Sequence, residues 1–91
     1  MQDRSNGPSM SQKIFTMNLD VETVSLYLLC CALADGGAAV TATLLMEKWN
    51  GDRAGLEQAM QRLEERNIIV RSAASPQGEP TYQIVHEKDW R

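Results

Sequence analysis

The residues best suited to chemistry are two adjacent cysteines, Cys30 and Cys31, which lie within an apolar run. Neighbouring residues of a helix point roughly 100° apart, so these thiols are poorly placed to form a disulfide. We expect two reduced thiols packed in the core, with a redox switch or a soft-metal site as the alternatives. A metal site needs more ligands, and His86 is the only histidine. We therefore predict no metal site and no cofactor.

Groups that could catalyse a reaction are equally scarce. His86 has no serine or cysteine partner in a recognisable motif. Glu64 and Glu65 are neighbours on an expected helix, so they do not form a facing pair of carboxylates. Gly36 and Gly37 are better explained as a helix stop than as a phosphate-binding loop. The sequence therefore predicts that the protein is not an enzyme.

Composition and charge narrow the class of protein further. The chain has 91 residues, of which 43% are hydrophobic, which suits a single globular domain. Nine basic residues face twelve acidic ones, and the net charge of -3 gives no general attraction to phosphate or anionic lipid. No apolar run is long enough to span a membrane, and the polar N-terminus does not resemble a secretory signal. We expect a cytoplasmic protein with a flexible tail over residues 1–12 and one domain over residues 13–91.

The elements that must position these residues begin with a short apolar stretch. Residues 14–19 are expected to form a short strand or an arm against the core. A first helix should follow Asp20, a favoured N-cap, and should end at Gly36 and Gly37. This helix is apolar on most sides, which is typical of a central helix covered by several neighbours or by a partner subunit.

Two further helices are expected on either side of a tight turn. Thr41 is placed to cap the second helix, and Asn50 and Gly51 are expected to end it in the left-handed conformation. Asp52 then caps a third helix over about residues 53–66, and Asn67 closes it. The apolar positions of this helix recur at i, i+3, i+4 and i+7, which predicts one buried face made of Leu56, Ala59, Met60 and Leu63.

The chain is expected to end in a β-hairpin. Residues 68–71 are rich in β-branched side chains, and residues 81–85 read as the returning strand. The tip of the turn between them is expected at residues 75–78. The predicted fold class is therefore α+β, with a three-helix core that contains a helix-turn-helix and is followed by a two-stranded antiparallel hairpin.

The segment from Leu56 to Val70 resembles winged helix-turn-helix domains of bacterial transcriptional regulators, of the multiple-antibiotic-resistance and arsenic-repressor types. In those families a Leu-Glu pair precedes a basic residue, a glycine and an apolar strand. Leu63, Glu64 and Arg66 fit this pattern, and Asn67 stands where the family has glycine. The resemblance spans about residues 20–85 and implies that the third helix recognises DNA.

On this resemblance we expect a transcriptional regulator that inserts residues 53–66 into the major groove of double-stranded DNA. The residues expected to contact DNA are Arg53, Ala54, Gln58, Gln61 and Arg62, with Lys48 and Arg71 adding positive charge. The first helix is apolar on most of its surface, which two short helices and one hairpin can hardly cover, so we also expect a homodimer. Its interface is expected at Phe15, Met17, Leu26, Tyr27 and Trp90.

A protein-interaction adaptor without DNA binding is the alternative function. The third helix and its cap carry four acidic residues against three basic ones, and the hairpin tip has no lysine or arginine. Both features reduce the number of phosphate contacts that the domain can make. The same fold also serves as a protein-binding module, so the resemblance alone does not choose between the two functions.

Overall fold

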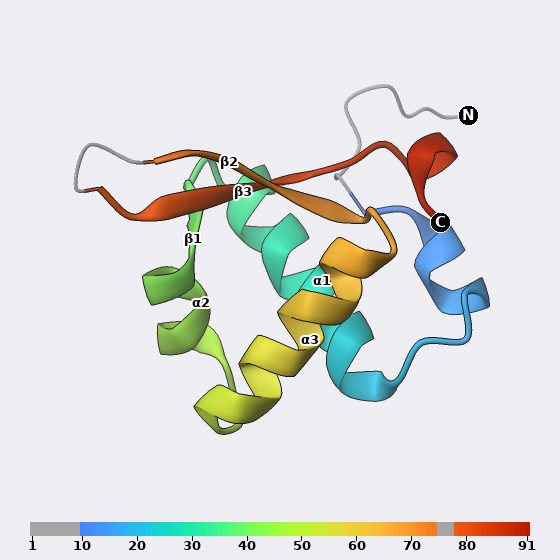
Figure 1. Cartoon of the computed structure of the whole chain (residues 1–91), viewed down its shortest axis with the longest axis horizontal. Helices are drawn as coiled ribbons and strands as arrows, with labels where there is room; N and C mark the ends of the chain where they lie inside the picture. The colour runs from blue at the N-terminus through green and yellow to red at the C-terminus, as the bar shows by residue number, and fades with distance from the viewer. Residues whose placement is uncertain (1–9, 75–77) are drawn as a thin grey trace.

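Three α-helices lie on one side of a three-stranded antiparallel sheet in the computed structural model, which describes residues 10–74 and 78–91 (Figure 1). Short 3-10 helices flank this arrangement near either end of the chain. The elements in chain order are η1 (Gln12–Thr16), α1 (Val21–Asp35), β1 (Val40–Thr41), α2 (Ala42–Lys48), α3 (Arg53–Glu65), β2 (Ile69–Ala74), β3 (Pro80–Ile84) and η2 (Glu87–Asp89). The predicted α+β class and the three helices are confirmed.

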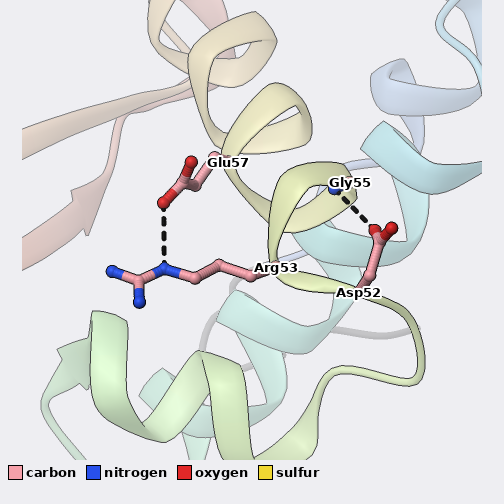
Figure 2. A network of polar contacts seen from close by, with 4 residues as sticks. All are labelled: Asp52, Arg53, Gly55 and Glu57. Carbon is pink, nitrogen blue, oxygen red and sulfur yellow. Dashed lines mark hydrogen bonds and ion pairs between the residues drawn. The ribbon is translucent and has the colours of Figure 1, made fainter.

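All three helices begin directly after the predicted N-cap residue, and two of the three caps use their side chains. The Thr41 hydroxyl accepts a hydrogen bond from the Leu44 backbone N–H at 3.1 Å. The Asp52 carboxylate accepts one from the Gly55 N–H at 2.8 Å (Figure 2). Asp20 occupies the N-cap position of α1 but makes no hydrogen bond to the helix backbone from its side chain. Its carboxylate is used elsewhere, as described below.

Helices α1 and α3 end in the same way. Gly37 and Asn67 adopt the left-handed conformation, with φ of 83° and 58°. The next backbone N–H then reaches back to the helix, from Ala38 to the Leu33 carbonyl and from Ile68 to the Leu63 carbonyl. This is the Schellman arrangement, and Asn67 fills the position that glycine usually takes. The predicted stop at Gly36 and Gly37 and the closure at Asn67 are both confirmed.

The expected left-handed end of α2 is wrong. This helix ends at Lys48, and Trp49 continues in an extended conformation. Asn50 and Gly51 have no positive φ. The Trp49 indole lies against Gly51, and a Cβ at this position would sit 2.9 Å from the indole nitrogen. This close contact, and not a left-handed conformation, favours glycine here. That nitrogen is buried and has no hydrogen-bond partner among the residues described.

The sheet has one strand more than predicted. Its order is β1-β3-β2, and β1 pairs with β3 through Val40 opposite Tyr82 and Thr41 opposite Thr81. The sequence prediction treated this segment as a link, because two residues are too few to display an alternating pattern. Strands β2 and β3 pair as antiparallel neighbours, as expected. Of the predicted hairpin tip only Gly78 is described, with φ of 85°; residues 75–77 lie outside the described residues.

The buried face of α3 is the one that its periodicity predicts. Leu56, Ala59, Met60 and Leu63 are all buried, and Leu63 has no exposed surface. They pack with α1, whose Leu26 and Tyr27 are also fully buried. The Tyr27 ring meets Trp90 edge to face, with ring centres 5.4 Å apart. Helix α1 is thus the central helix that its apolar surface indicated.

The segment before α1 forms the short helix η1 instead of a strand, and it packs against the core as the predicted arm would, with Ile14 fully buried. It lies beside η2, and Lys13 donates from its ammonium group to the Glu87 carbonyl at 3.2 Å. Ser11 donates from its backbone N–H to the Tyr27 hydroxyl at 2.7 Å and from its side chain to Glu87 at 2.5 Å. Residues 10–12, which the prediction placed in a flexible tail, therefore belong to the folded domain. Residues 1–9 lie outside the described residues.

The burial of α1 also corrects the predicted dimer contacts. Leu26, Tyr27 and Trp90 are at most 7% exposed within a single chain, so they have little surface to offer a second copy. Phe15 is 58% exposed and Met17 is half-buried, so these two remain available. In the part of the chain that is described, no helix has both the length and the apolarity needed to cross a membrane.

Candidate interaction surface on helices α2 and α3

The outer face of α3 is polar and is not used by the rest of the fold. Ala54, Gln58 and Gln61 are exposed, and their spacing of four and three residues places them on one side of the helix. The buried stripe lies on the opposite side. Gln61 donates from its side-chain amide to Glu65 at 3.3 Å, one turn further along. These side chains could therefore meet a partner without any change in the core.

Arg53, at the first position of α3, is paired within the helix. Its Nε lies 3.1 Å from a carboxylate oxygen of Glu57 (Figure 2). Both side chains are largely exposed, at 80% and 63%. Exposed pairs at this spacing contribute only about 0.3–0.5 kcal/mol, so a stronger anion could replace Glu57.

Arg62 is paired across the fold. Its Nη1 lies 2.9 Å from the Asp20 carboxylate, and the Thr23 hydroxyl donates to the same oxygen at 2.5 Å. The hydrogen bond from Thr23, helped by the Arg62 guanidinium, holds the pKa of Asp20 below its usual value. Asp20 therefore links the start of α1 to the last turn of α3.

The remaining predicted cations lie on elements other than α3. Lys48 is exposed in the last turn of α2. Arg71 is exposed on β2, with its guanidinium 5.9 Å from the centre of the Tyr82 ring on the neighbouring strand. Arg53 and Arg62 are separated by about 13 Å along the axis of α3, given a rise of 1.5 Å per residue. The structure thus distributes the positive charges over three elements.

Negative charge gathers at the start of α3. The position that a Cβ would take on Gly55 is 3.0 Å from the Asp52 carboxylate and 3.5 Å from that of Glu22. Glu22 belongs to the first turn of α1, and sequence reasoning missed it here because 30 positions separate it from Asp52. The N-terminal end of a helix attracts anions, but two carboxylates already occupy the surroundings of this one.

A hollow of about 380 Å³ lies between α2 and α3, and sequence reasoning missed it altogether. Its apolar lining comes from Ala42 and Met46 on α2 and from Leu56 and Met60 on α3. The charged residues around it are Glu47, Arg53 and Glu57. The only signal in the sequence was Met46, an apolar residue directly after Leu45. It is 39% exposed in the structure.

The cysteines lie away from this surface, inside α1. Cys30 has no exposed surface and Cys31 is 3% exposed. Burial, with a smaller contribution from the neighbouring thiol, raises the pKa of Cys30 to about 12, and burial likewise raises that of Cys31. Protonated, covered thiols react slowly, which favours the structural interpretation over a redox switch. The described residues contain no group of three or more His, Cys, Asp or Glu that could hold a metal ion.

Comparison of this chain with known protein families, with curated proteins and with solved structures gives no match.

Proposed function

We propose that this chain is a winged-helix domain that binds another protein through the surface formed by α2 and α3. The hollow between these helices carries the proposal, because its lining is mainly apolar and the charged residues around it are two glutamates and one arginine. Apolar surface of this kind favours contact with side chains, whereas a phosphate backbone requires cations that are free to approach it.

The winged-helix part of the proposal is supported by the order and pairing of the elements. Strand β1 lies between α1 and α2 in the chain, and the antiparallel pair β2 and β3 follows α3 (Figure 1). The β2–β3 pair would be the wing. Glu79, just before β3, accepts a hydrogen bond from the Thr43 backbone N–H at 2.6 Å. This contact joins the wing to the start of α2.

DNA binding is the second candidate function. The short connection between α2 and α3 and the exposed pair Gln58 and Gln61 favour it, since glutamine can pair with adenine in the major groove. The arginine pairs are not an obstacle in themselves, because exposed ion pairs contribute at most about 1 kcal/mol. The carboxylates of Glu22 and Asp52 weigh against it, since they lie where α3 would approach the phosphates.

A titration with labelled duplex DNA separates the two functions. At about 50 mM salt and tens of micromolar protein, a non-specific DNA binder should already respond. We expect no change in anisotropy under these conditions, either with random duplex or with DNA that flanks the gene.

Binding would overturn the proposal if two further results accompany it. The logarithm of the association constant should fall with the logarithm of the salt concentration, with a slope of about -0.9 for each phosphate contacted. The variants Arg53→Ala and Arg62→Ala should each weaken binding, and loss of a phosphate contact should flatten the slope by about one unit. In that event α3 is a recognition helix, and Gln58→Ala should cost about 1–3 kcal/mol at one base pair.

A further inference from the structure

We infer that the hollow between α2 and α3 receives an amphipathic peptide segment, with apolar side chains in the hollow and lysines or arginines beside it. The inference rests on the proposed function and adds the chemistry of the partner. It follows from which groups line the hollow, which of their charges are already paired, and what stands at its edges.

The apolar part of the surface favours an apolar occupant. Met46 is 39% exposed although it stands next to the buried Leu45, so the fold leaves it facing outward. Leu56 and Met60 form the other side of the hollow and are almost completely buried, at 4% and 8% exposed. A side chain inserted between Met46 on α2 and these two residues on α3 would cover Met46 without disturbing the core. Methionine adapts its shape to such contacts better than branched side chains do.

The charges around the hollow favour a basic neighbour. Glu47 makes no ion pair within residues 10–74 and 78–91. Glu57 is paired with Arg53, and Figure 2 shows both side chains leaving α3 on one side of the helix. The excess charge on the lining of the hollow is thus negative and is located on α2. A lysine or arginine that flanks the apolar contact would pair with Glu47, whereas an acidic segment would be repelled.

An amphipathic helix laid in a groove is a recurring way to present apolar and basic side chains together. Its apolar side chains lie one turn apart on one face, and its charged side chains lie on either side of that face. The hollow is small compared with a complete protein interface, so it suits a few anchors from a single segment. A second copy of this chain, or a DNA duplex, are the competing occupants, and the test below distinguishes them.

The test uses two labelled synthetic peptides of about 14 residues, or four helical turns, with leucines on one face. One peptide carries lysines on its other face and the other carries glutamates. We expect the lysine peptide to bind in an anisotropy titration and the glutamate peptide to bind at least about tenfold more weakly.

Matched variants locate the binding. Met46→Ser should weaken binding of the lysine peptide about tenfold, because the hollow loses its exposed apolar side chain. Val21→Ser is the control, since Val21 is 80% exposed on α1 and lies outside the hollow. Glu47→Gln should weaken binding about two- to fivefold, and Glu65→Gln, on the outer part of α3, should have no effect. Thermal unfolding of each variant verifies that the domain remains folded.

Each other outcome overturns the inference. If the lysine peptide does not bind at about 100 µM, or if Met46→Ser binds like the parent, the hollow is not its site. If the glutamate peptide binds equally well and Met46→Ser abolishes it, the surface still binds protein, and only the partner's charge was wrong. If the chain forms a dimer that Met46→Ser dissociates, the occupant is a second copy. If duplex DNA binds instead, the proposed function fails together with the inference.

Discussion

Raising the pH should destabilise this domain through its buried thiols, well before other groups of the core respond. Cys30 is fully buried in α1, and burial raises its pKa to about 12 from an ordinary value near 8.5–9. Between these two values the folded chain keeps the thiol proton while the unfolded chain releases it. The unfolded state then binds fewer protons than the native state, so the free energy of unfolding falls as the pH rises.

The size of the effect follows from this difference. The raised pKa of Cys30 contributes to the free energy of unfolding. This contribution is fully present below the ordinary thiol pKa and is lost at about 1.4 kcal/mol per pH unit above it. Between about pH 8 and pH 10 the loss is about 1–2 kcal/mol from Cys30 alone. Cys31, whose pKa is also raised, adds to the loss. Tyr27 contributes little in this range, because a tyrosine in the unfolded chain ionises near pH 10.

Urea unfolding followed by tryptophan fluorescence at several pH values measures the effect. The matched control is Cys30→Ala, which should be less stable at neutral pH because it leaves a small cavity. Its stability should nevertheless fall less between about pH 8 and pH 10, by the 1–2 kcal/mol that Cys30 supplied. Equal slopes for the parent and Cys30→Ala would refute the reasoning. Rapid labelling of Cys30 in the native state would refute it as well, since a buried, protonated thiol cannot react quickly.

Three further predictions concern the fold and its assembly. Leu63→Ala should lower the free energy of unfolding by about 2–5 kcal/mol, because the side chain has no exposed surface; a loss below about 1 kcal/mol in urea titrations would contradict its place in the core. A double-mutant cycle of Asp20→Asn with Arg62→Ala should give a coupling energy of about 0.2–1 kcal/mol that decreases with salt; no coupling would mean that the 2.9 Å pair is absent in solution. Sedimentation at micromolar concentration tests the predicted homodimer, which Phe15→Ser should weaken, and a monomer under these conditions would refute it.

The parts of the fold that could be predicted from the sequence are those that depend on residues close together in the chain. Thr41 and Asp52 cap helices because their side chains reach a backbone N–H only three residues away. Asn67 closes α3 because asparagine tolerates a positive φ. The buried face of α3 follows from helical periodicity alone.

The parts that could not be predicted depend on contacts between distant segments. Strand β1 exists because Val40 and Thr41 find partners on β3, about forty positions further along the chain. The short helix η1 is held by Tyr27 and Glu87, so the composition of residues 14–19 gave no clue to it. The hollow between α2 and α3 likewise depends on how two helices pack, which no pattern in either helix reveals.

The contacts between distant segments matter most for function where they pair charged side chains. A count along α3 finds arginines and glutamates without distinguishing those that bind one another from those that can bind a partner. The structure assigns Arg62 to Asp20 and Arg53 to Glu57, and it leaves Glu47 without an ion pair among the described residues. The pairs are exposed and weak, so they do not by themselves prevent either arginine from meeting a phosphate. Each guanidinium is bound through one nitrogen and is more than half exposed, so its other N–H groups are open to a phosphate. A lysine beside Met46 would meet Glu47, which has no ion pair to break among the described residues. The charges are therefore compatible with the proposed basic segment beside Glu47, and the duplex titration decides whether the arginines bind phosphate instead.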